Sequence, residues 1–388
     1  MKKFDIIMFN MSSYTEWEHG VSNRNYHVLK ELLKNPDIGT ILAVDYPPLT
    51  AKRAARNFIE NIITPLREGT VISRSLHDKL TKVSDRLFVY SNISFFKRPA
   101  SFMTAVKHAA VRAGLGECVV WSFVPPVMPY VRDLGQKLTI FDAVDNWAEH
   151  PSYAQFRDRL KENYAMIKSS ADVIFTVAEE LQSLFDNQPN VVWIPNGVDI
   201  QHYQTPAVLI NRDIADLPRP IIGYIGVVQE RVDIELIIFL AQKNPTKSFV
   251  LVGPVWNQKD KDRLRTIPNV HLLGYKSYSE APAYIQQFDV GIIPHRQSPF
   301  VTSTNPMKMY EYLACGIPVV ATAGSGAEQF KKFVHVAKNP EDFNRKLFVA
   351  LEEATDEMRT VRKNAIADHA WSRVVENMLA IVDKKYVY

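Results

Sequence analysis

The feature that most constrains the fold of this chain is the alternation of short apolar runs with longer amphipathic segments from end to end. The apolar runs are largely apolar at consecutive positions, which is typical of strands that are buried on both faces. Such strands belong to parallel sheets that are covered by helices on both sides. The sequence therefore predicts an α/β protein with doubly wound parallel sheets.

The predicted strands fall into two series, separated by a stretch rich in Pro, Asp and Asn. The first series is 4–10, 40–46, 87–92, 118–123, 137–144, 172–178 and 190–196. The second series is 220–226, 248–253, 270–274, 290–295, 318–322 and 334–337. A chain of 388 residues is long for a single core, so two domains are expected.

We predict an N-terminal domain at 1–199, a linker at 200–219 and a C-terminal domain at 220–370, followed by a helix at 371–388 that packs back on the first domain. Ligands of doubly wound sheets bind beyond the carboxyl ends of the strands. The two predicted domains are therefore expected to face each other across a cleft that holds the ligands.

The composition argues against several classes of protein. The chain has only two cysteines, Cys118 and Cys315, so a disulfide framework is excluded and a cytoplasmic location is expected. The net charge of +4 is too small to indicate nucleic-acid binding. The first residues are expected to form a β-strand rather than a signal peptide, no apolar run approaches about 18 residues, and no zinc-ligand spacing occurs. We expect no metal and no cofactor.

The segment STNPMKMYEYLACGIPVVAT, at 303–322, predicts a short helix directly before a buried strand. Pro306 suits the first helical position and Gly316 the position after the last turn. The three polar residues before Pro306 can supply the N-terminal cap. The helix N-terminus would then present N–H groups and a partial positive charge, which favour a bound anion.

Lys308 and Glu311 are three residues apart and so lie on about the same side of this helix. The lysine can add a full positive charge beside a diphosphate, and the glutamate can accept hydrogen bonds from two neighbouring ribose hydroxyls. The alternative is an exposed ion pair, which contributes little to stability.

The segment NPMKMYEYLACGIPVVAT resembles the donor-binding signature of nucleotide-sugar glycosyltransferases with the GT-B fold. Matching segments occur in the same order at 191–199, 219–228, 249–255, 269–296 and the helix after Trp371, and more loosely at 140–151. Among subfamilies, the chain looks most similar to bacterial teichuronic acid and exopolysaccharide glycosyltransferases of the family 4 type. The resemblance implies two Rossmann-like domains, with the donor on the second and the acceptor on the first.

The resemblance also implies that Glu311 holds the ribose and that Lys308 and the helix amides hold the diphosphate. Many family members carry a second glutamate eight residues earlier, where this chain has Ser303. The residues expected to take its place around the donor sugar are Ser303, Thr304, Asn305 and Met307.

Three more donor contacts are implied. Arg231 is the nearest match to a basic phosphate contact of the family, although it could instead pair with Asp233 or Glu235. Gly253 and Tyr275 end strands that the family places around the base, and Tyr275 could instead cap the sheet.

In the first domain, Asp142 and Asp145 lie in the segment FDAVDNW at the end of a predicted strand. We choose Asp145 as the candidate general base that takes the proton of the acceptor hydroxyl, as in inverting relatives. In a retaining enzyme Asp145 would only orient the substrate, and a loop-capping role is the structural alternative.

The connection after the first strand, at 12–32, supplies the candidate acceptor contacts Glu16, His19, Gly20 and Arg24. For each of these side chains an ordinary loop or helix-surface role is the alternative.

Residues 51–112 contain twelve basic and four acidic residues, with phenylalanines between them. Such a surface could contact anionic lipid headgroups on the inner face of the plasma membrane, and solvated helix faces are the alternative. No nucleic-acid recognition motif accompanies the charge.

The sequence thus predicts a hexosyltransferase that moves a sugar from a nucleotide-diphosphate donor, expected to be a UDP-sugar, to a saccharide or lipid-linked saccharide in cell-surface polysaccharide synthesis. Two alternatives stay open: a non-hydrolysing sugar-nucleotide epimerase, and a catalytically inactive relative that binds nucleotide sugars.

Overall fold

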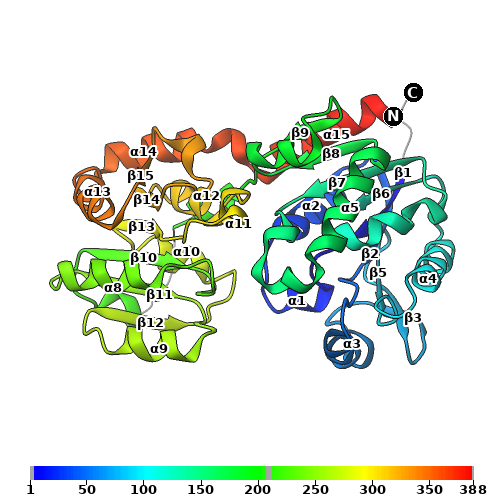
Figure 1. Ribbon diagram of the computed structural model, residues 1–388, viewed down its shortest axis with the longest axis horizontal. Helices are drawn as coiled ribbons and strands as arrows, with labels where there is room; N and C mark the ends of the chain where they lie inside the picture. Colours follow the sequence, from blue (N-terminus) through cyan, green and yellow to red (C-terminus); the bar gives the residue numbers. More distant parts are fainter. Residues whose placement is uncertain (1–3, 207–211, 387–388) are drawn as a thin grey trace. The chain divides into compact units, whose positions relative to one another are not determined.

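The computed structural model describes residues 4–206 and 212–386 of the chain (Figure 1). The chain forms two compact units. Unit 1 extends to Ile194 and resumes at Val375, and unit 2 is Pro195–Val374. Each unit is an α/β structure built on its own sheet, as the sequence predicts.

Unit 1 contains a nine-stranded sheet in the order β3-β4-β5-β2-β1-β6-β7-β8-β9. The strands that pair in parallel are β1 (Phe4–Phe9), β2 (Ile38–Val44), β5 (Leu87–Asn92), β6 (Cys118–Ser122), β7 (Leu138–Ala143), β8 (Val173–Thr176) and β9 (Val191–Trp193). All seven correspond to predicted strands. Their apolar side chains form the buried core, since Ile6, Val119 and Ile140 are fully buried.

Two strands at one edge of this sheet are not among the predicted strands. β3 (Thr70–Arg74) and β4 (Asp78–Lys82) form an antiparallel hairpin, and β4 pairs antiparallel with β5. Every residue of β3 is exposed or half-buried. The strand therefore lacks the apolar pattern on which the other predictions rest.

The main helices of unit 1 follow its parallel strands. They are α1 (Tyr14–Glu18), α2 (Arg24–Lys34), α3 (Ala51–Asn57) continued by the π-helical turn η1 (Phe58–Ile63), α4 (Pro99–Arg112) and α5 (Arg157–Ser170). The 3₁₀ segment η2 (Pro125–Leu134) packs against α4 and α5.

Unit 2 contains a six-stranded, fully parallel sheet in the order β12-β11-β10-β13-β14-β15. The strands are β10 (Ile221–Ile225), β11 (Ser248–Val252), β12 (Val270–Gly274), β13 (Val290–Ile293), β14 (Val319–Thr322) and β15 (Val334–Ala337). The helices are α8 (Ile234–Lys243), α9 (Gln258–Arg265), α10 (Ala281–Ile285), α11 (Pro299–Thr302), α12 (Met307–Ala314), α13 (Pro340–Glu352) and α14 (Asp356–Ala365).

Two apolar cores lie on opposite faces of the unit 2 sheet. Neighbouring residues of one strand go to different cores, as Val250 does in one and Leu251 in the other. Helices therefore cover both faces (Figure 1). Close packing requires glycine in the strands, because a Cβ at Gly291 would lie 2.5 Å from the ring of Tyr312.

The predicted linker at 200–219 differs from the structure. Its described residues belong to unit 2, where α6 (Ile200–Gln204) and α7 (Arg212–Ala215) place Tyr203 and Ile214 in the core. The cap of α6 lies directly before this range, where the Asp199 carboxylate accepts a hydrogen bond from the His202 N–H at 3.2 Å.

The last helix, α15 (Trp371–Tyr386), begins in unit 2 and continues into unit 1. At its start, the Trp371 N–H donates to the Val198 carbonyl at 3.2 Å. At its end, the Tyr386 ring packs 4.8 Å from that of Phe4, and its hydroxyl donates to Glu117 at 3.0 Å.

Candidate functional site

The candidate site in unit 2 is built around the N-terminus of α12, which follows β13. Helix N-termini that follow a parallel strand lie at the carboxyl edge of the sheet. In agreement, a Cβ at Gly226, just after β10, would lie 3.5 Å from Lys308 Cε and 3.7 Å from its Nζ. The lysine side chain thus rests against the turn that ends the first strand of the unit.

The start of α12 differs from the prediction in one respect. Pro306 occupies the cap position rather than the first helical position, and the helix begins at Met307. Within the described residues no side chain caps this helix, so Ser303, Thr304 and Asn305 do not supply the expected cap. An anion approaching the first turn would therefore meet no competing cap oxygen.

Lys308 lies in the first turn and is half-buried. Its Nζ sits over the ring of Tyr224, 4.9 Å from the centroid. Burial and the positive charge of Arg231 lower the Lys308 pKa to about 7, while Glu311 opposes this shift. A bound anion would restore the charged form of this lysine.

Glu311 is half-buried one turn later, and the hydroxyl of Tyr203 hydrogen-bonds its carboxylate. Burial raises the Glu311 pKa, whereas Lys308 and the Tyr203 hydrogen bond act in the opposite direction. The carboxylate is therefore held by groups of α6 and α12 at the same site as the lysine, and is not part of an exposed surface pair.

Arg231 is close enough to Lys308 for its positive charge to lower the pKa of the lysine. The alternative partners proposed for Arg231 are engaged elsewhere. Asp233 caps α8 by accepting from the Leu236 N–H at 3.1 Å, and Glu235 pairs with Arg263 at 2.6 Å. With the Gln229 amide turned so that its oxygen faces the guanidinium, Arg231 donates to that oxygen at 3.0 and 3.1 Å.

His295, at the end of β13, completes the cluster. Its ring is buried, and neither ring nitrogen has a hydrogen-bond partner among the described residues. Burial, Lys308 and Arg231 hold the pKa of His295 well below its usual value, so the imidazole is neutral. The sequence predicts no site role for Tyr203 and Tyr224, because nothing in their spacing distinguishes them from core residues. His295 ends a predicted strand near the site, but a lone histidine there is more often structural.

The residues before α12 are held by the fold itself. The hydroxyls of Ser303 and Thr304 each donate to a backbone carbonyl of α11, at 2.7 Å. The Asn305 amide oxygen accepts from the Asn196 N–H and from the Tyr310 hydroxyl, both at 2.9 Å. These bonds fix the entry to α12.

The remaining predicted donor residues occupy different environments. Met307 is half-buried at the start of α12. Gly253 has a φ of +138°, and a Cβ there would lie 2.2 Å from the Gly226 carbonyl oxygen, so only glycine fits. Tyr275 follows β12 and is 59% exposed.

In unit 1, Asp145 is half-buried in the loop after β7, and its backbone carbonyl accepts from the Tyr164 hydroxyl at 3.0 Å. Asp142, the alternative carboxylate, is fully buried and accepts two hydrogen bonds from Arg24 Nε at 2.9 and 3.1 Å. Burial raises the pKa of Asp142, while Arg24 lowers it.

Arg24 therefore has a structural role and not the predicted contact with an acceptor. Its side chain is fully buried at the first position of α2, and it joins that helix to β7. Arg24 directly follows the cap residue Asn23, and a charged side chain at this position is normally expected on the helix surface.

The other predicted acceptor contacts lie around α1. Glu16 completes a capping box with Ser13, accepting from its N–H at 2.9 Å, and also pairs with Arg53 at 3.0 Å. His19 is exposed at the end of α1, and Gly20 adopts a left-handed conformation with φ of +89°. The structure thus assigns Glu16 a local structural role and leaves His19 at the surface.

No group of three or more His, Cys, Asp or Glu side chains within residues 4–206 and 212–386 could hold a metal ion. No helix there is long and apolar enough to cross a membrane.

Comparison with known proteins finds similarity to glycosyltransferases. Residues 219–353 match the family model of group 1 glycosyl transferases. The chain is 26% identical over 344 residues to TuaH of Bacillus subtilis (strain 168), whose name places it among the glycosyltransferases of teichuronic acid biosynthesis. That match covers 83% of this chain and 84% of TuaH.

Solved structures show the same fold at low sequence identity. Sucrose-phosphate synthase of Thermosynechococcus elongatus matches with a TM-score of 0.71 and 15% identity, covering 99% of both chains. Anabaena HepE, in complex with UDP and glucose, matches with a TM-score of 0.65 and 14% identity, covering 98% of this chain and 99% of HepE. Residues 219–353 therefore match the group 1 glycosyl transferases, and the chain as a whole is similar to TuaH and has the fold of these solved structures, GT-B.

Proposed function

We propose that the protein transfers a hexose from a UDP-sugar to a saccharide or lipid-linked saccharide acceptor in the synthesis of a cell-surface polysaccharide. The observation that carries this proposal is the gathering of Lys308, Glu311 and Arg231 at the N-terminus of α12. The name of TuaH supports the polysaccharide assignment, and the UDP complex of HepE supports the choice of base.

In this proposal the charges of the α12 site have separate tasks. Lys308, Arg231 and the first-turn amides bind the diphosphate and offset the charge that develops on it as it leaves. Glu311 accepts hydrogen bonds from the ribose hydroxyls. These groups supply positive charge without a metal ion, so we propose a metal-independent reaction.

Asp145 is our candidate for the general base. It would take the proton of the acceptor hydroxyl while that oxygen bonds to the anomeric carbon and the bond to the diphosphate breaks. The products are the glycosylated acceptor, UDP and a protonated Asp145, which then releases its proton to solvent.

A thermal-shift screen against UDP-, GDP-, ADP- and CMP-sugars tests the donor assignment directly. We expect the melting temperature to rise with UDP-sugars and to stay constant with the others. Stabilisation by another nucleotide sugar alone would refute the choice of base. Incubating the preferred donor without an acceptor then tests for an epimerase, which would convert the donor alone. Incubating it with a series of acceptors tests for an inactive relative, which would leave the donor unchanged with every acceptor.

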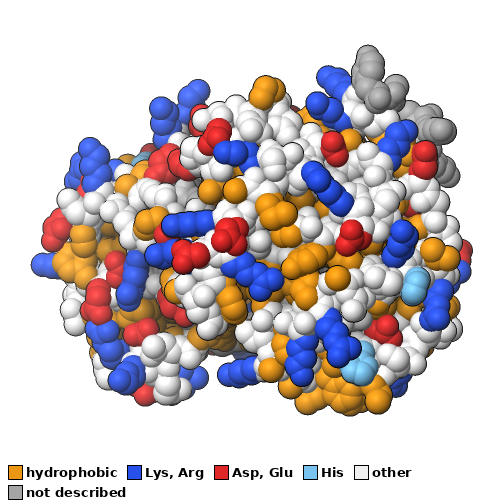
Figure 2. Space-filling model, turned by 45° about the vertical axis from the view of Figure 1, so that its right-hand side comes forward, with side chains coloured by type: hydrophobic (Ala, Val, Ile, Leu, Met, Phe, Trp, Pro, Cys, Tyr) orange, Lys and Arg blue, Asp and Glu red, His pale blue; other side chains and the backbone are white. Residues whose placement is uncertain are grey.

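We also propose peripheral contact with an anionic membrane through the end of unit 1 that carries η1 and the β3–β4 hairpin. Large aliphatic side chains are exposed there among basic residues (Figure 2). The exposed aliphatic residues are Ile59, Ile63, Val71, Ile72 and Leu76, and the exposed basic residues include Lys52, Arg67 and Arg74. Leu76→Asp should reduce co-sedimentation with phosphatidylglycerol vesicles, and equal sedimentation of both proteins would contradict the contact.

A further inference from the structure

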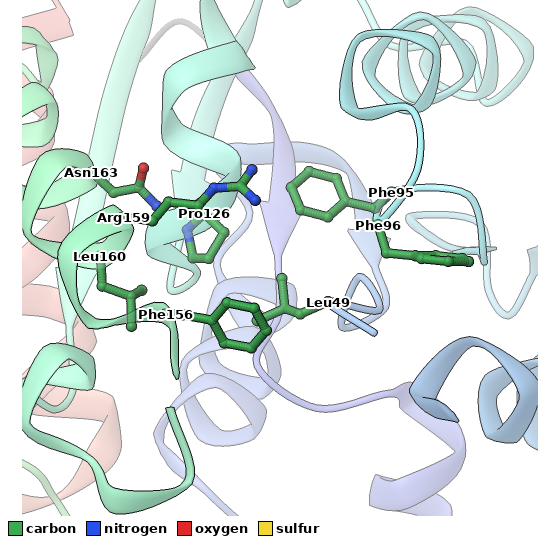
Figure 3. A pocket seen from close by; sticks show the side chains of 8 residues that line it. All are labelled: Leu49, Phe95, Phe96, Pro126, Phe156, Arg159, Leu160 and Asn163. Carbon is green, nitrogen blue, oxygen red and sulfur yellow. The ribbon is translucent and has the colours of Figure 1, made fainter. Parts of the chain in front are cut away.

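Unit 1 contains a pocket that none of the roles above uses (Figure 3). Its space measures about 400 Å³ when the part open to solvent is counted, and about 30 Å³ when only the positions available to the centre of a water-sized sphere are counted. The lining residues are Leu49, Phe95, Phe96, Pro126, Phe156, Arg159, Leu160 and Asn163.

The pocket lies where doubly wound sheets bind ligands. Leu49 follows β2 and Phe95 follows β5, whereas Pro126 follows β6 and Phe156 follows β7. In the sheet, β1 separates the β2/β5 side from the β6/β7 side. The lining thus comes from the carboxyl ends of strands on both sides of the point where the strand order reverses.

The walls of the pocket are mainly apolar. Phe95 and Leu160 are each only 2% exposed, so they form a fixed, packed surface. The rings of Phe95 and Phe156 and the side chain of Leu49 lie around one side of the space (Figure 3). Such walls favour an apolar chain over a hydrated sugar.

Two hydrogen-bond donors lie on the other side of the pocket (Figure 3). Arg159 brings an exposed guanidinium. Asn163 is 4% exposed, and its amide nitrogen has no hydrogen-bond partner among the described residues. A buried donor without an acceptor is unfavourable, so an oxygen of a ligand would stabilise it.

No carboxylate lines this pocket, so it offers donors and apolar contact but no charged acceptor. A sugar would require acceptors for its hydroxyl protons, whereas a phosphate ester presents acceptor oxygens only. We propose that the pocket binds the phosphate ester of an apolar chain, with the phosphate on Arg159 and Asn163 and the chain among the phenylalanines. This inference rests on the proposed function and narrows it, because it assigns the acceptor to the lipid-linked class.

Calorimetric titration of the full chain with geranyl phosphate tests the proposal, with geraniol and inorganic phosphate as partial probes. We expect geranyl phosphate to bind saturably and each partial probe to bind at least tenfold more weakly. Arg159→Gln should weaken geranyl phosphate at least tenfold. Lys161→Gln, an exposed change on the same helix that does not line the pocket, should leave binding unchanged.

Phe156→Ala is the matched test of the apolar wall, since Phe156 is half-buried and its removal need not disturb the core. It should weaken geraniol and geranyl phosphate together. Equal affinity of the wild type and Arg159→Gln for geranyl phosphate would overturn the proposal. A lack of geranyl phosphate binding to the wild type would also overturn it. So would saturable binding of an uncharged oligosaccharide such as maltotriose when geranyl phosphate does not bind.

Measuring UDP binding to the same proteins distinguishes a failure of the pocket assignment from a failure of the proposed transferase function. Arg159 lies in unit 1 and the α12 site in unit 2, so Arg159→Gln should leave UDP affinity unchanged. If UDP binds and geranyl phosphate does not, the pocket assignment fails and the proposed transferase stands. If geranyl phosphate binds and no nucleotide sugar does, the pocket stands and the proposed function fails.

Discussion

At the scale of single residues, the central group is the Lys308 ammonium. Its pKa of about 7 results from burial and from the nearby charge of Arg231, against the attraction of Glu311. The neighbouring His295 is neutral, because its pKa lies well below the usual value. Lys308 is therefore the group in this cluster whose charge is expected to change near neutral pH.

We expect affinity for UDP-glucose to fall as the pH is raised from about 6 to about 9, by up to about tenfold for each pH unit above 7. The sign follows because the diphosphate binds the protonated lysine, which is the dominant form only below its pKa. Calorimetry at several pH values measures this. Lys308→Met should bind weakly at every pH, and a wild type whose affinity is constant over this range would contradict the role of Lys308.

Asp145→Asn should depress turnover strongly while leaving UDP affinity nearly unchanged, because the amide cannot accept the acceptor's proton. Initial rates with a confirmed donor and acceptor, together with UDP calorimetry, measure the two effects separately. The matched control is Asp158→Asn, an exposed change on α5. Turnover equal to that of the control would remove Asp145 from the chemistry.

The roles of individual residues were predictable only where a motif carried them. The position of Lys308 and Glu311 on one short helix follows from Pro306, Gly316 and their spacing, and the structure places both at one site. By contrast, the partner Tyr203 comes from α6, a distant segment of the chain, and its approach depends on tertiary packing that no local pattern encodes. His295 precedes α12 closely in the chain, but no motif distinguishes it from a structural histidine.

At the scale of elements, the strands with continuous apolar runs were predictable, because burial on both faces leaves a clear pattern. The exposed hairpin of β3 and β4 was not, since its residues resemble a loop. The role of Arg24 was also not predictable, because a charged residue in a first helical turn is normally exposed.

The buried pair of Arg24 and Asp142 makes a prediction about stability. Arg24→Met leaves the Asp142 carboxylate buried without its cation, which should lower the free energy of unfolding by about 3–5 kcal/mol. Urea denaturation measures the change. Lys82→Met removes the partner of the exposed Asp85 and should cost no more than about 1 kcal/mol. Similar losses in both variants would show that the buried pair is not a structural link.

At the scale of the whole molecule, the two-unit architecture and the match of residues 219–353 to group 1 glycosyl transferases were predictable, because the motifs of unit 2 are specific in combination. The first domain was predicted to end at residue 199, whereas unit 1 ends at Ile194 and the described part of the predicted linker belongs to unit 2. The acceptor side was the least predictable part, because no motif carries its candidate residues.

Metal independence is a property of the complete reaction. We expect turnover to be unchanged by EDTA, because Lys308, Arg231 and the α12 amides supply the positive charge that the diphosphate requires. A rate assay with and without the chelator measures this. Loss of activity in EDTA that Mn²⁺ restores would contradict the expectation.

The most direct test of the account is calorimetric titration of UDP into the wild type and Glu311→Ala. If Lys308 and Glu311 bind the two ends of one ribosyl diphosphate, the variant should lose about 1–3 kcal/mol of UDP binding free energy, the value of a charged hydrogen-bond set. Its affinity for pyrophosphate, which has no ribose, should stay the same. Equal UDP affinity of the two proteins would contradict the central claim.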